Sequence, residues 1–197
     1  MENKIIKVAH VIGLAINGGT ESLWMNYYKH IDRTMVQFDF LVESESAIIN
    51  KKEIEQLGGN VVIIPTYKNP IKYIKSLTKL FKEHNYDIVH SNMNALSVFA
   101  LKAAKKAGIK VRIAHSHSTS NKKEWKKNVI KNLLRLFSKK YATNYFACSE
   151  LAGRWLFGNK TYNQGKVTII KNAIDIDKFK FNVDNRKVIR NEFNVLD

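Results

Sequence analysis

The 197-residue sequence contains little cysteine and proline, few acidic residues and no long hydrophobic run. Its single cysteine, Cys148, excludes an intramolecular disulfide and any zinc site built from several cysteines. The strand-like residues around Cys148 indicate a small buried side chain rather than a nucleophile. No apolar stretch approaches the roughly 18 residues that a membrane-spanning helix needs. The first residues also lack the order of a secretory signal. We therefore expect a cytoplasmic protein without an integral membrane segment.

The shortage of acidic residues leaves 17 Asp and Glu against 33 Lys and Arg, a net charge of +16. An excess of this size attracts polyanions such as nucleic acids, anionic membranes or phosphorylated substrates. The densest stretch is 122–140, which holds eight basic residues and one glutamate. Apolar residues recur within and just after it at helical spacing, at Val129, Leu133, Phe137 and Tyr141.

This basic stretch has three interpretations. The simplest is a helix that packs its apolar stripe on the core and turns a solvated basic side outward. The basic flanks, the apolar stripe and Trp125 also fit a helix that docks on anionic lipid at the inner face of the cell membrane. Nucleic-acid binding favours basic residues interleaved with exposed aromatics, whereas these aromatics fall mainly at apolar positions. Membrane association is therefore favoured over nucleic acid, and we expect no nucleic-acid partner.

Short apolar runs rich in Val and Ile alternate with helical patterns along the chain. The runs typical of buried strands lie at 5–12, 38–42, 61–64, 87–90, 111–114, 145–147 and 167–170. Helical spacing follows Thr20 and Pro70, and an alanine-rich face at 100–107 stops at Gly108. This alternation predicts an α/β fold, a Rossmann-like parallel sheet with helices on both faces.

The turn Asn17-Gly18-Gly19-Thr20-Glu21 separates the first strand from a helix. Gly18 and Gly19 have no Cβ, so their backbone can adopt positive φ and approach a ligand closely. Thr20 can cap the helix, whose first N–H groups then face the turn. Because a helix N-terminus after a glycine turn attracts anions, the turn is a candidate phosphate site. Its glycines are also explained by geometry alone.

Polar residues follow five of the predicted strands, at 18–20, 90–92, 115–118, 149–150 and 172–175. Ligands of open parallel sheets bind outside the carboxyl ends of the strands, so these residues should form one polar crevice. His115 and His117 are two residues apart, and a continuing strand would point both the same way. No further metal ligands lie at a recognisable spacing, so we expect no metal site. A purely hydrogen-bonding role and a catalytic or substrate-orienting role stay open for these histidines.

Three common motifs are missing. The glycines at 13, 18 and 19 do not form G-x-G-x-x-G, which disfavours a dinucleotide-binding dehydrogenase. The segment 158–161 lacks the spacing of a P-loop, which disfavours an ATPase of that class. No G-x-S-x-G nucleophile elbow occurs either.

Five features occur in a fixed order: an apolar strand, Gly18-Gly19-Thr20-Glu21, a later His-Ser-His, Ser149-Glu150 and Asn172-Ala173-Ile174-Asp175. This order resembles the N-terminal, acceptor-side domain of the retaining glycosyltransferases of family 4, over about residues 5–193. The resemblance implies one half of a two-domain GT-B architecture. It also implies an enzyme that moves a sugar from a nucleotide-sugar donor to a polysaccharide or lipid-linked acceptor, as in bacterial capsular or exopolysaccharide synthesis.

The resemblance implies roles for single residues as well. Gly18 and Gly19 would lie against the diphosphate of the donor, with Thr20 near the sugar or the acceptor. The active-site histidine of the family falls best on His117 and less well on His115. No metal and no cofactor besides the nucleotide-sugar substrate is implied.

Four further residues join the predicted binding site. Ser149 and Glu150 match the start of the helix that follows the sixth strand, and Asn92 lies after the fourth. Asn172 matches a loop near the junction of the two domains, where Ala173 replaces the usual glycine of the family.

The chain becomes polar after Phe179 and includes a short predicted helix at 188–193. We expect residues 1–178 to form the Rossmann-like domain and residues 179–197 to form a connector towards a C-terminal domain that this chain lacks. The family binds most of its donor in that second domain, so this chain alone should have little or no activity. Two other classes stay open: a non-catalytic module for polyanions or membrane surfaces, and a small nucleotide or sugar-phosphate enzyme.

Overall fold

The computed structural model describes residues 4–13, 19–43, 51–119 and 125–195. Its centre is a parallel sheet with the strand order β3-β2-β1-β4-β5-β6-β7. The strands are β1 Ile6–Gly13, β2 Val36–Glu43, β3 Asn60–Ile64, β4 Ile88–Ser91, β5 Val111–Ser116, β6 Asn144–Ala147 and β7 Val167–Ile169. Each predicted strand overlaps one of these, and the predicted Rossmann-like fold is confirmed.

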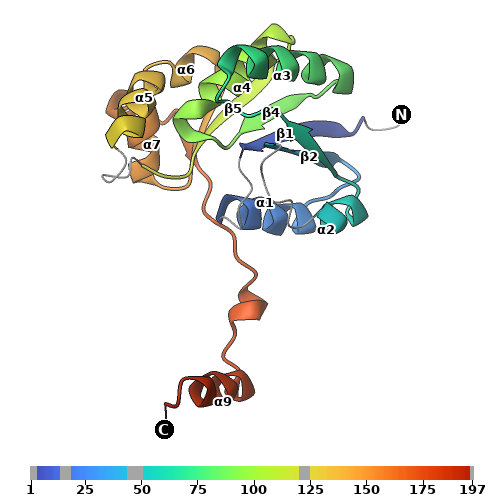
Figure 1. Cartoon of the computed structure of the whole chain (residues 1–197), viewed down its shortest axis with the longest axis vertical. Helices are drawn as coiled ribbons and strands as arrows, with labels where there is room; N and C mark the ends of the chain where they lie inside the picture. Colours follow the sequence, from blue (N-terminus) through green and yellow to red (C-terminus); the bar gives the residue numbers. More distant parts are fainter. Residues whose placement is uncertain (1–3, 14–18, 44–50, 120–124, 196–197) are drawn as a thin grey trace.

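Helices cover both faces of the sheet (Figure 1). One face carries α1 Gly19–His30 and α2 Lys51–Gln56, and the other carries α3 Pro70–His84 and α4 Ser97–Lys106. The remaining helices before β7 are α5 Trp125–Arg135, α6 Ser138–Tyr141, α7 Glu150–Phe157 and α8 Asn159–Asn163, with a short 3₁₀ turn, η1 Asn94–Leu96, after β4.

Alternation along the strands divides the core into two clusters. Ala9 and Val11 of β1 belong to the cluster that also contains α3 and α4, whereas Val8 belongs to the cluster under α1. Ala103 and Ala104 of α4 are fully buried, as the predicted small-residue face requires. Gly108 then ends this helical segment with a φ of 86°, which confirms the predicted stop.

The basic stretch departs from the predicted single helix. α5 ends at Arg135, where Leu136 and Phe137 donate backbone hydrogen bonds to the carbonyls three residues earlier, and α6 begins at Ser138. Val129 and Leu133 of the predicted core-facing stripe are 62% and 59% exposed. Leu134, one position later, contacts the core cluster instead. The sequence pattern also gave no indication of α2.

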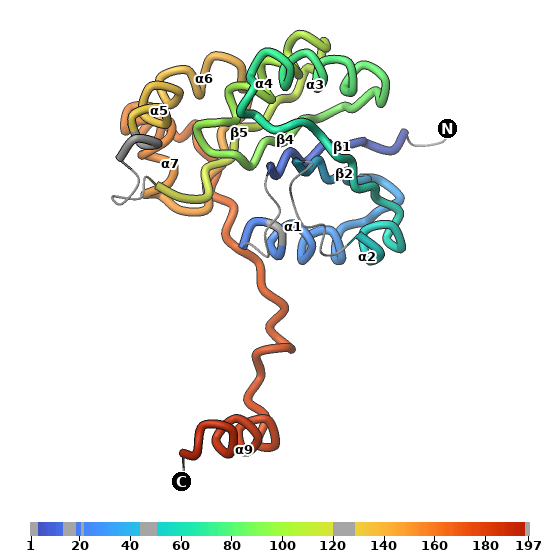
Figure 2. Tube along the Cα trace, viewed as in Figure 1, coloured from blue at the N-terminus to red at the C-terminus, as the bar shows by residue number. Residues whose placement is uncertain are grey.

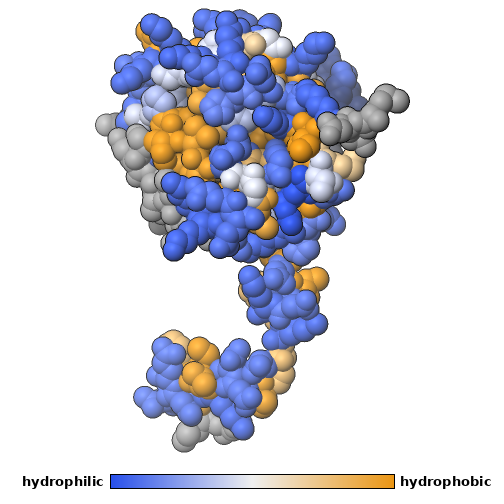
Figure 3. Space-filling model, turned by 90° about the vertical axis from the view of Figure 1, so that its right-hand side faces the viewer, coloured by the Kyte–Doolittle hydropathy of each residue, from blue (hydrophilic) through white to orange (hydrophobic). Residues whose placement is uncertain are grey.

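The C-terminal segment extends away from the sheet (Figures 1 and 2). It contains a 3₁₀ turn, η2 Ile176–Phe179, and the helix α9 Val183–Glu192, so the predicted helix near residue 188 is confirmed and begins earlier. Phe179 and Phe181 are 72% and 80% exposed. Hydrophobic and hydrophilic side chains lie next to each other on this segment (Figure 3).

Candidate functional site

The candidate site lies where the order of the strands reverses, between the adjacent strands β1 and β4. At such a point the connections of neighbouring strands leave in opposite directions, which opens a crevice at the carboxyl edge of the sheet. β1 ends at Gly13, whose φ of 78° is unfavourable for residues with a Cβ. β4 and β5 bring the polar residues Asn92 and His117 to the same edge.

Asn92 joins two aromatic side chains from distant parts of the chain. Its Oδ1 accepts a hydrogen bond from Trp24 Nε1 of α1 at 2.8 Å and lies 2.9 Å from His117 Nε2. Its Nδ2 donates to the backbone carbonyl of His90 at 3.3 Å. Trp24 and Asn92 are 6% and 5% exposed, whereas His117 is half-buried. Asn92 is therefore a buried link between the sheet edge and α1.

The backbone at His117 is held by its neighbours. Asn94 Oδ1 accepts hydrogen bonds from the backbone N–H groups of His117 at 2.7 Å and Ser118 at 3.3 Å. Asn94 has a φ of 51°, a conformation that asparagine tolerates better than most residues. Cys148 lies just after β6 and is partly buried, and its Sγ donates to the His117 carbonyl at 3.3 Å. The predicted burial of Cys148 is therefore only partial, and its side chain also contacts the site.

Four imidazoles form a row on the α1 side of the sheet, and the Trp24 ring of α1 contacts three of them, those of His10, His90 and His115. His10 and His90 face each other in the register of β1 and β4, with ring centroids 4.9 Å apart. His90 Nε2 lies 3.0 Å from His115 Nδ1, and the His115 ring stacks on His117 with centroids 4.0 Å apart. His115 and His117 therefore point to the same side, as their spacing predicted.

Burial keeps this row uncharged. It lowers the pKa of His10 to about 3 and that of His115 to about 2, with a smaller contribution from the nearby His117. The pKa of His90 is also well below its usual value, mainly because the ring is buried. For His117, burial lowers the pKa to about 4. All four rings are neutral imidazoles at pH 7.

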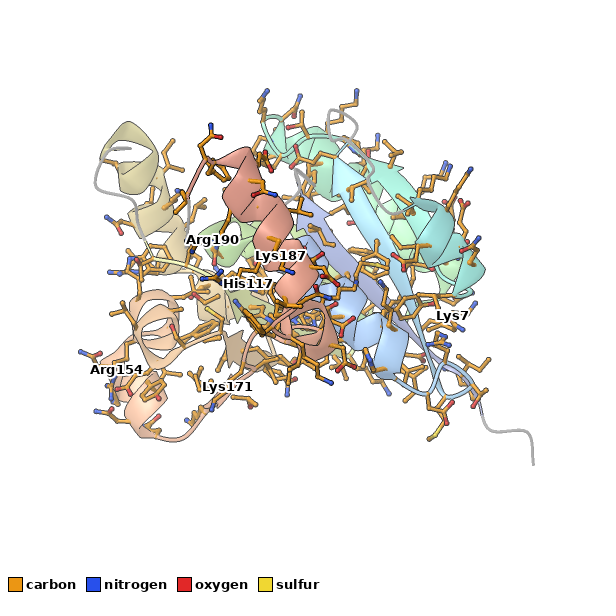
Figure 4. The ribbon with its side chains drawn as sticks, turned by 90° about the horizontal axis from the view of Figure 1, so that it is seen from below. Lys7, His117, Arg154, Lys171, Lys187 and Arg190 are labelled. Carbon is orange, nitrogen blue, oxygen red and sulfur yellow. The ribbon has the colours of Figure 1, made fainter. Side chains whose placement is uncertain are left out.

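The two histidines that the sequence left as alternatives differ in access. His115 is fully buried, and its Nδ1 is within hydrogen-bonding distance of His90 Nε2. It therefore cannot reach a ligand in the crevice. His117 follows the end of β5 and is half-buried. Viewed from below, His117 lies near the middle of the domain, between Lys7 on one side and Arg154 on the other (Figure 4). Among the described residues, no three His, Cys, Asp or Glu side chains are arranged to hold a metal ion.

A cavity of about 330 Å³ opens beside Asn92 and Asn94. Asn92, Asn94 and Ser118 supply its polar wall. The rest of the lining is mostly apolar, with one basic residue, and consists of Ile12, Tyr67, Met93, Ala95, Leu96, Thr119, Lys131 and Trp155. Such a pocket can hold a small polar group against an apolar surface.

The glycine turn lies only partly within the described residues, and Gly18 falls outside them. α1 begins at Gly19, which is exposed, so Thr20 lies in the first turn of the helix. The prediction that Thr20 caps this helix is therefore wrong, because a cap at Thr20 requires a helix that begins at Glu21, and α1 begins two residues earlier. The first N–H groups of α1 still lie at the carboxyl edge of the sheet, after β1.

Ser149 and Glu150 lie at the start of α7. Ser149 is the N-cap, and its side chain accepts a hydrogen bond from the backbone N–H of Ala152 at 3.3 Å. Glu150 is exposed and pairs with Arg154 at 2.6 Å. Both predicted site residues thus make contacts within α7.

Asn172 is exposed in the loop after β7, and this loop is anchored to α1. Tyr27 donates its hydroxyl hydrogen to the carbonyl of Lys171, and Asn26 Nδ2 donates to the carbonyl of Ala173, both at 3.0 Å. Ala173 packs against the cluster under α1. The structure therefore brings the loop of Asn172 to α1, the helix that begins at the glycine turn.

Sequence reasoning missed three residues that build this site: His10, Trp24 and Asn94. An isolated histidine in an apolar strand and a tryptophan at a helical apolar position read as core residues. Only Asn94 could have been noticed in the sequence, because asparagine is enriched at backbone positions with positive φ.

Comparisons with known proteins agree on one family. The family described as Glycosyltransferase Family 4 matches residues 17–178. The chain is 34% identical over 178 residues to the putative glycosyltransferase EpsF of Bacillus subtilis (strain 168), which covers 88% of this chain and 46% of that protein. It is 27% identical to the capsular polysaccharide biosynthesis glycosyltransferase CapH of Staphylococcus aureus, with 90% of this chain and 50% of that protein covered.

A third relative is the UDP-Gal:alpha-D-GlcNAc-diphosphoundecaprenol alpha-1,3-galactosyltransferase of Escherichia coli, which is 26% identical and covers 88% of this chain and 46% of that protein. Among solved structures, HepE of Anabaena in complex with UDP-glucose superposes with a TM-score of 0.68 at 16% identity, covering 96% of this chain and 50% of that chain. The likeness to HepE concerns the fold. The chain spans about half the length of the curated relatives it matches.

Proposed function

We propose that this chain, which belongs to glycosyltransferase family 4, forms the acceptor-side half of a sugar transferase. The enzyme would move a sugar from a nucleotide-sugar donor to a polysaccharide or lipid-linked acceptor in the synthesis of a bacterial surface polysaccharide. One observation carries the proposal: His117, a neutral imidazole, contacts Asn92 at the switch point of the sheet, and Asn92 lines a cavity of about 330 Å³.

The glycine turn is the proposed phosphate side of the site. α1 begins at Gly19, so its unpaired N–H groups and the positive end of its dipole lie after β1. Sugar transfer places negative charge on the departing diphosphate of the donor. Backbone N–H groups of Gly18 and Gly19 would stabilise that charge, with Thr20 in the first helical turn nearby.

His117 is the proposed contact to the reacting substrates. Because burial lowers its pKa to about 4, the ring is uncharged at pH 7 and is a poor partner for a diphosphate. A neutral imidazole instead suits a hydroxyl group of the sugar or the acceptor. His117 would therefore orient a hydroxyl group of the sugar or the acceptor, while the N-terminus of α1 would stabilise the negative charge of the diphosphate.

The cavity beside Asn92 and Asn94 is the proposed acceptor pocket. Its asparagine and serine side chains can hydrogen-bond a sugar, and its apolar residues can cover one face of the sugar ring. Trp155 and Tyr67 supply the aromatic part of this lining.

The division of the chain is also a proposal. Residues 1–178 would form the catalytic half-domain, and 179–197 would be a connector to a second domain that binds most of the donor. The exposure of Phe179 and Phe181, and the coverage of about half of each relative, support this division. The Asn172 loop, anchored to α1, would then lie near the junction of the two domains.

The outer side of α5 and the following turn is the proposed contact to the membrane. Five large apolar side chains there are exposed by 41% or more: Val129, Ile130, Leu133, Leu136 and Phe137. Basic residues lie between and after them in the sequence, which contains no acidic residue from Trp125 to Tyr141. Among the described residues, no helix is both long enough and apolar enough to cross a bilayer. Exposed apolar and basic side chains together complement an anionic lipid surface, where a lipid-linked acceptor resides.

A transfer assay tests the proposal. The chain would be compared with a two-domain version, in which it continues into a second α/β domain, using UDP-sugars and an undecaprenyl-diphosphate-sugar acceptor. We expect transfer by the two-domain version and little or none by the chain alone. Appreciable turnover by the chain alone would contradict the half-enzyme proposal. No transfer by the two-domain version with any UDP-sugar would contradict the transferase proposal.

A further inference from the structure

The side chain of Asn92 has only one orientation that satisfies its neighbours. Trp24 Nε1–H is a donor with no acceptor capacity, and it lies 2.8 Å from one end of the amide, which must be the oxygen. The His90 carbonyl can only accept, and it lies 3.3 Å from the other end, which must be the NH₂ group. One contact to each end of the amide thus fixes the orientation of this buried side chain.

The fixed amide determines which nitrogen of His117 carries the proton. Asn92 Oδ1 has no proton to give, and it lies 2.9 Å from His117 Nε2. The hydrogen bond therefore requires a proton on Nε2. The opposite tautomer would place two lone pairs against each other at 2.9 Å in a buried site. Since a neutral imidazole has only one N–H, the lone pair then lies on Nδ1.

The geometry assigns Trp24 and Asn92 as positioning residues that hold His117 in its Nε2–H tautomer and leave the Nδ1 lone pair for a ligand. Within the described part of the chain, His117 Nδ1 has no hydrogen-bond partner. The assignment of these two residues to transfer rests on the proposed function, whereas the tautomer itself does not. Trp24 acts through Asn92 and has no polar contact of its own with His117.

This arrangement gives His117 a defined chemical selectivity. An imidazole that presents a lone pair accepts a hydrogen bond from a ligand O–H group and repels an anionic oxygen. The stack of His117 on His115 holds the plane of the ring, and Asn94 holds its backbone. Loss of the Trp24–Asn92 contact would leave the ring in place but free to exchange tautomers.

Nitrogen-15 NMR of the chain at pH 7.5 reads the tautomer directly, because the unprotonated ring nitrogen resonates far downfield of the protonated one. The chain is labelled at histidine, and His117→Gln assigns the signals. We expect Nδ1 of His117 to be the unprotonated nitrogen. In Asn92→Leu and Trp24→Phe the two nitrogens should move towards averaged shifts, more strongly in Asn92→Leu. Asn163→Leu removes an exposed amide of α8, is the matched control for Asn92→Leu and should leave these shifts unchanged.

Asn92→Asp separates positioning from packing. The carboxylate keeps an acceptor for both Trp24 and His117, so the Nε2–H tautomer should persist, and the nearby negative charge should raise the pKa of His117. An unprotonated Nε2 in the original chain, or Nε2–H retained in Asn92→Leu, would overturn the assignment. If Asn92→Leu fails to fold, the nitrogen shifts of His117 in Trp24→Phe test the assignment: averaged shifts support it, and an unchanged Nε2–H signal overturns it.

Activity provides the second readout. In the two-domain version, Trp24→Phe should lower kcat roughly tenfold to a hundredfold, with little change in KM for the donor. A tautomer change without any loss of kcat would overturn the positioning role. Absence of transfer by the original two-domain version, with the expected NMR shifts, would contradict only the proposed function.

Discussion

His115 and His117 stack with their ring centroids 4.0 Å apart, yet His115 is fully buried whereas His117 is half-buried. The strand alternation that brings both rings to one side also places His115 against the buried His90 and leaves His117 beyond the end of β5. One of the two rings therefore belongs to the core, and the other belongs to the crevice.

Acid should destabilise the domain steeply because its buried histidines are neutral when folded. Their pKa values lie below that of an unfolded histidine, so the unfolded chain binds protons first as the pH falls. Their stabilising effect is complete above pH 6.5 and is lost from there down to the folded pKa values of about 4, 3 and 2. Each histidine can contribute up to about 1.4 kcal/mol per pH unit in this range. Urea unfolding between pH 8 and pH 4.5 measures the slope.

A variant of the histidine row sharpens this test. Both ring nitrogens of His10 are buried without a hydrogen-bond partner, so His10→Phe removes an unsatisfied group and one titrating site. Below pH 6, we expect the free energy of unfolding to depend less steeply on pH in this variant. The difference should correspond to about one proton fewer taken up on unfolding. His84→Phe, at an exposed position, is the control. Equal slopes for the original chain and His10→Phe would contradict this account.

Asn94 should be needed both for its conformation and for its contact to His117. Asn94→Gly keeps access to positive φ and loses only the side-chain contact, whereas Asn94→Ala should cost about 1 kcal/mol more in the free energy of unfolding. Both variants should lower transfer by the two-domain version.

Asn85 provides the matched control for Asn94, since it has a φ of 52° at the end of α3. Asn85→Gly and Asn85→Ala should differ in stability in the same way, measured by urea unfolding, and should leave transfer unchanged. A loss of transfer confined to Asn94→Ala would show that the Asn94 side chain does not act on His117.

The outer side of α5 and the following turn should bind anionic vesicles through its exposed apolar and basic side chains. Leu133→Glu places a negative charge on this surface and should weaken binding to phosphatidylglycerol vesicles at least about fivefold, the equivalent of roughly 1 kcal/mol. Met35→Glu makes the same change at a 53% exposed residue before β2 and should have little effect.

Co-sedimentation measures vesicle binding, with neutral phosphatidylcholine vesicles and high salt as further conditions. Binding to the anionic vesicles should disappear at high salt because counter-ions screen the basic residues. Equal losses in Leu133→Glu and Met35→Glu would assign the effect to net charge and contradict a specific surface.

The sequence predicted the strands, the alanine face of α4 and the helix start at Pro70, because these depend on local periodicity and local breakers. It could not predict the histidine row, which depends on the register of β1 against β4 and of β4 against β5. The link from Trp24 to Asn92 joins residues that are 68 positions apart, so no local pattern indicates it. The helix break at 136–137 was missed because the apolar spacing continues through it, while tertiary packing selects Leu134 instead of Leu133.

The proposed role of His117 is to contact the reacting substrates of a sugar transfer. The most direct measurement is kcat of the two-domain version with His117→Ala, with His84→Ala as the control at an exposed position and vesicle-embedded lipid-linked acceptor as the substrate. We predict that His117→Ala lowers kcat roughly a hundredfold while the fold is retained, and that His84→Ala has little effect. A kcat for His117→Ala within about twofold of the original value would contradict the account.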